Sequence, residues 1–330
     1  MAYATDIGID LGTTNIVIYI KGKGIVLREP AMIAYDRDAE KIRAYGEDAR
    51  QMIGRTPSNV SCIRPLKDGV ITDYLMTEKM LRYFINKAMG RRGFLKPRIV
   101  ISVPSRVTDV ERRAVEEATY QAGARDVVIA PDSIASAIGA GIDITRPSGN
   151  LIVDIGGGAT NIAIITMGGI AQSVSIPAAG REFTKAIIRF VRKKYMLFIG
   201  EQTAEAVKLK IGAAVRLPEG KSMEVRGRNV FTDMPDSVNI RTNELAGPLG
   251  DVANRIADAA CSLLEQTTPE LASDISSRGI VLTGGGARLK GIDQVIRFRT
   301  GIDVITAPHP ENVVALGTGR YLEIMGSAAK

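Results

Sequence analysis

The chain has 330 residues, of which 45% are hydrophobic and 24% are charged, which is enough apolar material for hydrophobic cores in two domains or in one large bilobed domain. Two cysteines, Cys62 and Cys261, exclude a disulfide framework and fit a reducing cytosol, although a single bridge between them stays open. The formal net charge of +7 is compatible with nucleic acid, with an anionic membrane surface, or simply with a solvated basic surface.

The first half of the chain predicts strands that alternate with helices. Ile7–Ile20 is rich in β-branched residues and predicts two strands around a Gly-Thr turn; it begins without the basic segment of a signal peptide. Residues 29–64 carry polar turns and short apolar runs, and we expect a small inserted subdomain there. The further elements expected are a helix over Thr77–Met89, a strand over Arg98–Pro104 ended by proline, a helix from a Thr108/Glu111 capping box to Gly123, a strand over Asp126–Ala130 and a helix to Gly141.

A second half begins near Pro147 and repeats the pattern. Asn150–Thr166 again predicts a strand, a glycine turn and a strand. The elements expected after it are helices over Glu182–Tyr195, Glu201–Ile211 and Asn243–Gln266, short strands near Met223–Arg226 and Val238–Ile240, and a strand, triple-glycine turn and helix start over Gly279–Ile292. Alternating strands and helices predict an α/β fold. No uninterrupted apolar run reaches about 18 residues, so we expect no membrane-spanning segment.

The two halves share one sequence signature. Asp10-Leu11-Gly12-Thr13-Thr14-Asn15 and Asp154-Ile155-Gly156-Gly157-Gly158-Ala159-Thr160-Asn161 each begin with an aspartate at the end of an apolar strand and have glycine two positions later. An apolar strand follows each of them. This echo predicts two copies of one supersecondary unit, one in each half.

Both glycine turns have the chemistry of phosphate loops. Glycine removes the Cβ that would keep an anion away from backbone N–H donors, and the first turn adds side-chain donors. The predicted contacts are Thr13, Thr14 and Asn15 in the first loop and Gly156, Gly157 and Gly158 in the second. An ordinary β-hairpin with glycine in its turn would explain one such sequence. Two matched copies and a third glycine turn favour phosphate binding.

An aspartate stands at the mouth of each loop, and a third loop follows later in the chain. Mg²⁺ bound to a nucleotide takes one or two carboxylates, so Asp10 and Asp154 are candidate metal ligands; capping of the turn is the alternative. Gly284-Gly285-Gly286-Ala287 ends a strand at a helix start and matches neither a Walker A loop nor a dinucleotide fingerprint. Such a backbone lets a flat base or ribose lie against it.

In order and spacing, the three loops resemble those of the actin, sugar-kinase and DnaK-type chaperone superfamily. The finer resemblance is to the MreB/Mbl bacterial actins. It rests on blocks spread over the whole chain: Lys21–Ala34, Gly54–Tyr74, Val110–Ala114, Ala137–Ile142, Ile199–Glu205, Val225–Asn229 and Thr268–Gly286.

This resemblance implies an actin-like ATPase fold, in which two RNase-H-like domains with two smaller subdomains surround a nucleotide cleft. Domain I would span residues 1–146, with its core at 1–31 and 66–146 and a small subdomain at 32–65. Domain II would have its core at 147–181 and 242–312, a small subdomain at 182–241, and a C-terminal helix at 313–330 that returns to domain I. The implied cofactors are ATP and Mg²⁺. Family contacts carry over onto the three loops and, on the ribose side, onto Glu205 and Lys208.

The resemblance also implies partners and a location. The family polymerises head to tail into paired protofilaments on the inner face of the cell membrane, and works with the cell-wall elongation machinery. We therefore expect a cytoplasmic, peripheral protein. Phe94 and Leu95 lie among cations in the sequence Gly90–Arg98 and match the family's hydrophobic insertion loop, although both side chains packing into a core is the alternative.

The sequence departs from this family at the positions expected to support hydrolysis. Asp132 stands where the family carries a glutamate that orients water, and Ala159 replaces a threonine after the three glycines. We expect Asp132, Asp154 and Thr160 to serve as the catalytic residues and hydrolysis to be slow. A benign alternative is that Asp132 acts through a second water or that Thr160 replaces the lost hydroxyl.

Other functions on the same fold are less well supported by the sequence. A small-molecule kinase would need a substrate site beside the γ-phosphate, and no separate sugar-site motif is present. A chaperone ATPase would need a substrate-binding domain beyond Lys330. Nucleic-acid binding would need an aromatic-basic motif, so we expect no nucleic-acid partner. Sedimentation with and without ATP distinguishes the filament from the kinase and the chaperone.

Overall fold

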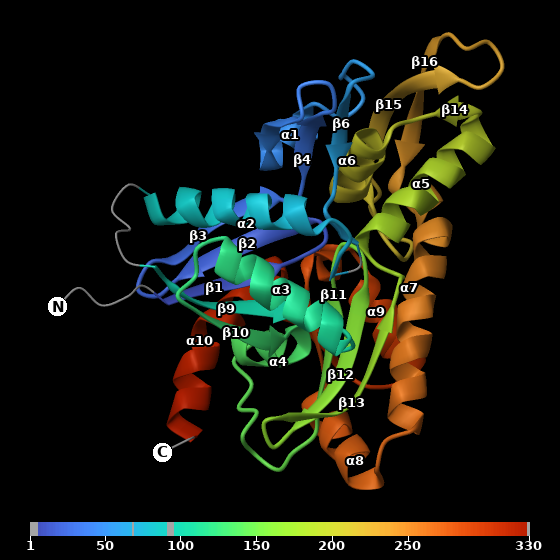
Figure 1. Ribbon diagram of the computed structural model, residues 1–330. Helices are drawn as coiled ribbons and strands as arrows, with labels where there is room; N and C mark the ends of the chain where they lie inside the picture. The colour runs from blue at the N-terminus through green and yellow to red at the C-terminus, as the bar shows by residue number, and fades with distance from the viewer. Residues whose placement is uncertain (1–5, 68, 91–95, 329–330) are drawn as a thin grey trace. The chain divides into compact units, whose positions relative to one another are not determined.

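The computed structural model describes residues 6–67, 69–90 and 96–328. The chain divides into two compact units (Figure 1). Unit 1 comprises residues 1–146, 165–170 and 311–330, and unit 2 comprises residues 147–164 and 171–310. The first predicted phosphate loop therefore belongs to unit 1, and the second and third belong to unit 2.

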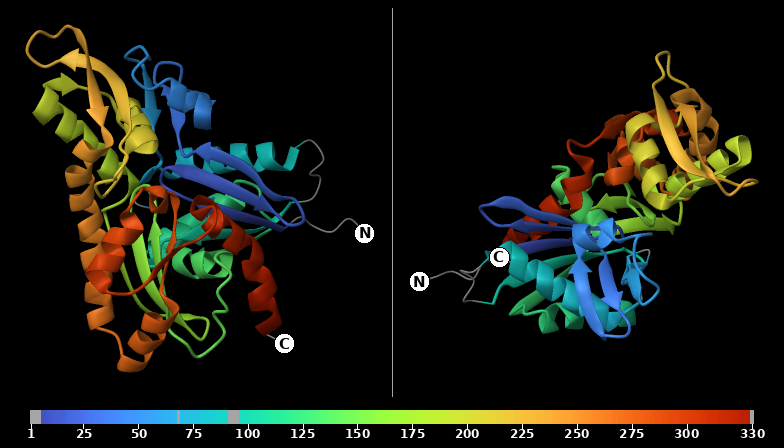
Figure 2. Two further views of the ribbon diagram at one scale, coloured as in Figure 1. Left: turned by 180° about the vertical axis from the view of Figure 1, so that it is seen from behind. Right: turned by 90° about the horizontal axis from the view of Figure 1, so that it is seen from above.

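The large sheet of unit 1 has the strand order β10-β9-β1-β2-β3. Its strands are β1 (Asp6–Leu11), β2 (Asn15–Ile20), β3 (Gly24–Pro30), β9 (Arg98–Val103) and β10 (Asp126–Pro131). β1, β2 and β3 form an antiparallel meander, and β9 and β10 run parallel to β1. Helices α2 (Tyr74–Met89) and α3 (Asp109–Gln121) cover one face. Helices α4 (Asp132–Gly139) and α10 (Val313–Ala328) pack together on the other face (Figures 1 and 2).

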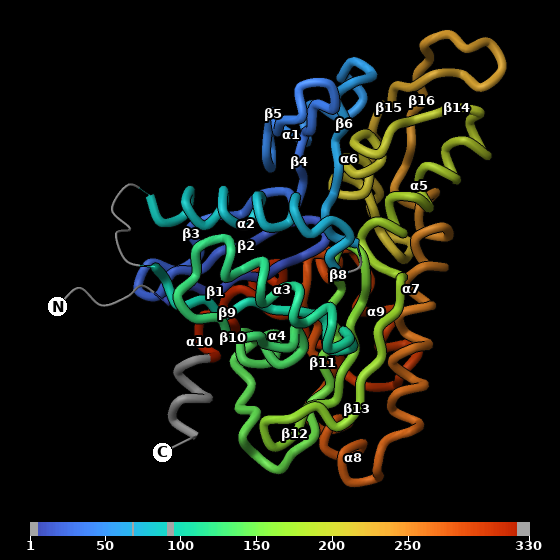
Figure 3. The backbone as a smooth tube through the Cα atoms, in the orientation of Figure 1, coloured from blue at the N-terminus to red at the C-terminus, as the bar shows by residue number. Residues whose placement is uncertain are grey.

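A smaller sheet of unit 1 lies between β3 and α2 in the sequence. β4 (Ile33–Asp36) is paired with β5 (Lys41–Tyr45) on one side and with β6 (Val60–Ile63) on the other, both antiparallel. Helix α1 (Gly46–Gln51) packs against this sheet, and a two-stranded ribbon, β7 (Leu66–Lys67) and β8 (Val70–Ile71), leads back toward α2 (Figure 3).

The large sheet of unit 2 repeats the arrangement of unit 1. Its order is β13-β12-β11-β17-β18, so three consecutive strands are again followed by two later strands parallel to the first. The strands are β11 (Asn150–Ile155), β12 (Thr160–Thr166), β13 (Gly169–Ile176), β17 (Ile280–Thr283) and β18 (Val304–Thr306). The helices that accompany it are α5 (Gly180–Tyr195), α7 (Thr242–Glu265), α8 (Pro269–Arg278) and α9 (Ile292–Thr300). This shared strand order is what the duplicated sequence signature predicts.

A second, three-stranded sheet of unit 2 has the order β14-β15-β16. It consists of β14 (Leu197–Phe198), β15 (Ser222–Asn229) and β16 (Pro235–Arg241). Helix α6 (Glu201–Ile211) packs against both β15 and α5. One large core joins this sheet, its helices and the large sheet of unit 2.

The structure tests several of the predictions about single elements. The Thr108/Glu111 capping box is confirmed, because Thr108 Oγ1 accepts from the Glu111 amide at 3.2 Å and the Glu111 carboxylate accepts from the Thr108 amide at 2.8 Å. The triple glycine does not open an α-helix: Gly285–Arg288 is a 3₁₀ helix, and α9 starts only at Ile292. Cys62 and Cys261 are both free. Among the described residues, the helices are too short or too polar to cross a membrane.

Candidate functional site

The first glycine loop connects β1 and β2 in unit 1. A Cβ placed on Gly12 would lie 2.6 Å from the Asn15 carbonyl oxygen and 3.6 Å from Asp10 Oδ1, so this turn requires glycine. Thr14 Oγ1 is buried and has no hydrogen-bond partner among the described residues. A buried hydroxyl without a partner is costly, and a bound ligand oxygen would satisfy it. Asn15, the last predicted contact of this loop, is exposed.

A second glycine supports this loop from a distant part of the chain. The Gly69 amide donates to Thr13 Oγ1 at 2.7 Å, across 56 positions of sequence. Gly69 has a φ of +81°, and a Cβ there would lie 2.1 Å from Pro104 Cγ. Sequence reasoning missed Gly69, because only the folded chain brings it to Thr13.

Asp132 stands at the first position of α4, directly after β10. Burial raises the pKa of its carboxyl to about 6, and the hydroxyl of Ser102 opposes part of that increase. Ser102 lies on β9 opposite Ala130 of β10. Ser133, the residue after Asp132, forms a hydrogen bond of 2.6 Å between its Oγ and Ser105 Oγ. The Asp132 carboxyl is therefore mostly ionised at pH 7 and protonated in mild acid.

The second glycine loop connects β11 and β12 in unit 2. The Gly156 amide donates to the Ala159 carbonyl at 3.1 Å and closes the turn. The carbonyls of Gly156 and Gly157 accept from the amides of Gly180 and Arg181, at 3.0 and 2.8 Å. The first two amides of α5 thus hold the loop by its carbonyls, which fixes the strand-to-helix geometry on this side.

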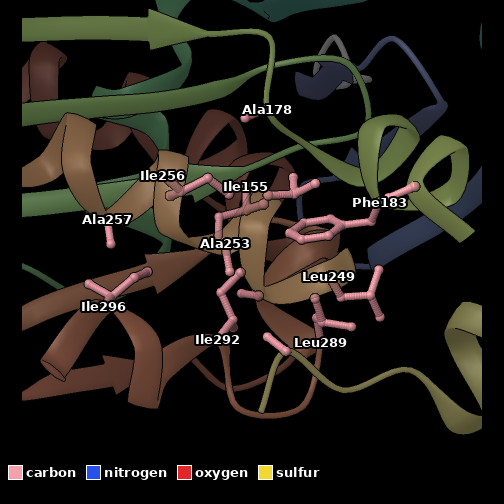
Figure 4. Packing of buried hydrophobic residues seen from close by; sticks show 14 of the residues in the cluster. Ile155, Ala178, Phe183, Leu249, Ala253, Ile256, Ala257, Leu289, Ile292 and Ile296 are labelled. Carbon is pink, nitrogen blue, oxygen red and sulfur yellow. The ribbon is translucent and has the colours of Figure 1, made fainter. Parts of the chain in front are cut away.

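The core of unit 2 anchors this loop from below. Ile155, the last residue of β11, is fully buried, and Phe183 in the first turn of α5 is 1% exposed. Both side chains pack in one cluster with Leu249 and Ala253 of α7 (Figure 4). Displacement of the loop would therefore disturb the core of the unit, which favours a rigid binding loop.

Asp154 lies beside the third glycine loop. It pairs with Thr283 across β11 and β17, is 6% exposed, and accepts a hydrogen bond from Thr283 Oγ1 at 3.2 Å. Gly284 has a φ of +81°, and a Cβ there would lie 2.4 Å from Asp154 Oδ1. A Cβ on Gly286 would lie 2.3 Å from Ile155 Cγ2, and Ala287 is buried. The structure therefore brings the aspartate, the second loop and the third loop together within unit 2.

Thr160 has a structural contact in this arrangement. Its side chain is fully buried, and its hydroxyl donates to the Ala178 carbonyl at 2.5 Å. The hydroxyl proton is therefore used inside the protein. Asn161 is 8% exposed, and its Oδ1 has no hydrogen-bond partner among the described residues.

Glu205 and Lys208 form an ion pair of 2.7 Å on α6. Lys208 Nζ also donates to the Gly180 carbonyl at 2.9 Å and contacts Thr184 Oγ1 at 3.1 Å. Glu205 Oε2 accepts from Thr184 Oγ1 at 2.6 Å. The pair ties α6 to the first turns of α5, where the second glycine loop is also held.

The two predicted metal ligands lie in separate parts of the fold. Asp10 and Asp154 belong to different units. The part of the chain that the structure describes contains no group of three or more His, Cys, Asp or Glu side chains that would hold an ion. The predicted membrane residues Phe94 and Leu95 lie outside the described residues.

Known proteins match this chain over nearly its whole length. The family described as MreB/Mbl protein matches residues 4–330. The chain is 47% identical to the cell shape-determining protein Mbl of Bacillus cereus over 97% of this chain and 96% of that protein. It is 45% identical to the cell shape-determining protein MreB of Escherichia coli K12, over 98% and 94%. The solved structure of MreB5 of Spiroplasma citri bound to AMPPNP is 34% identical, with a TM-score of 0.94 over 100% of this chain and 99% of that one.

Proposed function

The chain belongs to the MreB/Mbl family and has its actin-like fold, and we propose that it is an ATP-binding bacterial actin that polymerises into filaments supporting cell shape. The observation that carries the nucleotide proposal is the close approach of Gly284 to Asp154. Gly284 has a φ of +81°, and the Cβ of any other residue at this position would occupy the space beside the Asp154 carboxylate. The binding of AMPPNP and of ADP by MreB5 of Spiroplasma citri supports ATP as the nucleotide.

Each unit carries candidate contacts for a nucleotide. We assign the phosphates to Thr13, Thr14 and Asn15 of the first loop and to the glycines of the second loop. The unpartnered hydroxyl of Thr14 and the missing Cβ of Gly12 support this assignment. The third loop, Gly284 to Ala287, would take the adenosine. Lys208 Nζ donates its hydrogen bonds to Gly180, Thr184 and Glu205 within the protein. Glu205, whose side chain is 40% exposed, is therefore the residue of this pair that we propose binds a ribose hydroxyl.

Mg²⁺ would be held by Asp10 and Asp154 together with phosphate oxygens and water, which is the ordinary coordination of a nucleotide-bound ion. When bound, the ion would supply charge neutralisation on the phosphates. The burial of Asp154 and its hydrogen bond from Thr283 hold its carboxylate in one orientation. We propose Asp132 as the residue that orients water, with Asp154 positioned beside the phosphates. The hydroxyl of Thr160 is already donated to Ala178, so we give it the smaller role.

Membership of the family supports a proposal for assembly and location. We propose head-to-tail filaments with paired protofilaments, bound peripherally to the inner face of the cell membrane through Phe94 and Leu95, and acting with the cell-wall elongation machinery in the cytoplasm. A head-to-tail contact joins two different faces and therefore continues without closing, which produces a filament. Hydrolysis is proposed to be slow, because Asp132 is shorter than glutamate and Ala159 lacks a hydroxyl.

Nucleotide binding is tested by Gly284→Ala. We expect the variant to bind a fluorescent ATP analogue at least tenfold more weakly, because the new Cβ would displace Asp154 Oδ1 or the loop itself. Gly90→Ala is the matched control, since its φ of +67° and ψ of −171° lie close to the +81° and 161° of Gly284, but no described residue lies within 4 Å of its Cβ position. It carries a similar backbone strain without the collision. Equal affinity of both variants would contradict the assignment of the third loop.

A further inference from the structure

A hollow surface lies at the far end of the three-stranded sheet of unit 2. We call it the basic hairpin surface, and it is a hollow of about 430 Å³ that is open to solvent and is lined by Arg189, Arg192, Lys193, Met196, Val230 and Phe231. The three cations come from the last turns of α5, and Val230 and Phe231 come from the loop between β15 and β16 (Figure 1). The assigned nucleotide residues include none of these side chains.

Hydrogen bonds connect the loop that carries Phe231 to Asn229 and to the end of α5. Asn229 Oδ1 accepts from the amides of Phe231 and Thr232, at 2.9 and 3.3 Å. The Val230 amide donates to the Met196 carbonyl at 2.8 Å, which ties the loop to the end of α5. Phe231 nevertheless remains 75% exposed, and Met234 beside it is 64% exposed. A hydrogen-bonded loop that exposes a phenylalanine and a methionine side by side to solvent indicates a binding surface.

The charges around this ring favour an anionic partner. Residues 189–198 and 226–236 together carry six cations and two acids. Of the two acids, Asp233 is paired with Arg228 at 3.5 Å, and Asp236 accepts from Asn229 Nδ2 at 3.1 Å. Arg189 is paired with Glu182 at 2.9 Å, whereas Arg192 and Lys193 are exposed and have no carboxylate partner among the described residues. Two uncompensated cations therefore stand beside the exposed apolar side chains.

Another exposed phenylalanine of unit 2 lacks this combination. Phe298 on α9 is 92% exposed and lies between two arginines. Arg297 is paired with Asp303 at 2.9 Å, and Arg299 is paired with Asp258 at 2.6 Å. Apolar exposure is thus at least as large at Phe298, but its flanking cations are neutralised within the protein.

We propose that the basic hairpin surface binds an anionic lipid bilayer, with Phe231 in the interfacial layer and Arg192 and Lys193 against the headgroup phosphates. A bilayer accepts an exposed ring without a partner surface of matching shape, and its anionic headgroups attract the unpaired cations that line the same surface. The inference rests on the proposed membrane association and gives it a second contact, separate from Phe94 and Leu95.

Flotation of the full chain without nucleotide tests this contact. The vesicles are phosphatidylglycerol with phosphatidylcholine, compared with phosphatidylcholine alone. Phe231→Ser is expected to lower the partition onto the anionic vesicles roughly tenfold, while Phe298→Ser leaves it unchanged. The double change Arg192→Gln with Lys193→Gln is expected to lower the partition and to weaken its dependence on salt. Because Phe231 is exposed and outside the core, its replacement preserves the fold.

The other possible outcomes contradict the proposal, and each one identifies the part of it that is wrong. Unchanged flotation of Phe231→Ser overturns it, and a simultaneous loss of filament sedimentation would instead assign the surface to a contact between copies. If Phe94→Ser with Leu95→Ser abolishes flotation while Phe231→Ser has no effect, only the second contact is wrong. If the native chain does not float on anionic vesicles, the proposed membrane association fails as well.

Discussion

Gly317→Ala is expected to destabilise the folded protein by ~3 kcal/mol and to lower its unfolding temperature by roughly 6–12 °C. Gly317 lies where α10 crosses α4, and a Cβ there would stand 1.7 Å from the Ala135 carbonyl oxygen. Gly139 on α4 has the reciprocal contact, with its Cβ position 1.9 Å from the Val313 carbonyl oxygen. The obstruction is backbone, so no side-chain rotation relieves it, and the helices would have to separate.

The control for this prediction is Gly247→Ala on α7. Gly247 is an exposed helix residue with nothing within 4 Å of its Cβ position. Alanine there removes the conformational freedom of glycine, but its Cβ also meets the ring of Pro248, which disfavours the helical conformation of the preceding residue, so the two effects oppose each other and the variant is expected to stay within about 1 kcal/mol of the native chain. Thermal unfolding followed by circular dichroism compares the two. Equal unfolding temperatures for Gly317→Ala and the native chain would show that α4 and α10 are not packed as described.

Asp132→Glu combined with Ala159→Thr is expected to accelerate phosphate release from filaments by roughly tenfold to a hundredfold. Glutamate is one C–C bond longer, about 1.5 Å, and a misplacement near 1 Å at a reacting centre costs on the order of a hundredfold. The threonine would restore a hydroxyl at a position where Thr160, whose own hydroxyl is donated to Ala178, does not provide one. Asp109→Glu, at the first turn of α3, is the control for lengthening an aspartate elsewhere.

The pH dependence of phosphate release by the native chain is a second test of the proposed role of Asp132 in orienting water. Burial raises the pKa of this carboxyl to about 6, so the group is protonated below that pH and ionised above it. A carboxylate that orients water acts in its ionised form, and release should therefore fall as the pH drops through 6. Native release as fast as that of the double variant, at any pH, would remove Asp132 and Ala159 as the limiting residues.

Local sequence signals predicted the elements on which the site is built. The capping box of Thr108 and Glu111 is present as drawn from the sequence, and α6 spans Glu201–Ile211 as expected. β15 and β16 are longer than expected because most of their side chains are exposed, which leaves a weak apolar pattern at their ends. α2 begins at Tyr74 and not at Thr77, because Asp73 caps it by accepting from the Met76 amide.

Long-range contacts were beyond the reach of the sequence. The Gly69 amide reaches Thr13 only after β7 and β8 fold back toward the first loop, and no local signal marks it. The commitment of the Thr160 hydroxyl to Ala178 and of Lys208 to Gly180 likewise depends on how α5 meets the second loop. The spacing of the glycine motifs thus predicted the candidate residues of the site. Their hydrogen-bond partners could not be predicted, because tertiary packing determines them.

Electron microscopy and sedimentation of the native chain and of Gly284→Ala, each with and without ATP and Mg²⁺, test most directly whether this chain is a nucleotide-dependent filament. The account predicts filaments and a protein pellet for the native chain at micromolar concentration with ATP, and neither without nucleotide. It predicts that Gly284→Ala needs at least tenfold more ATP than the native chain to assemble. A native chain that stays monomeric with ATP and lipid present, or a Gly284→Ala variant that assembles as readily as the native chain, would contradict the account.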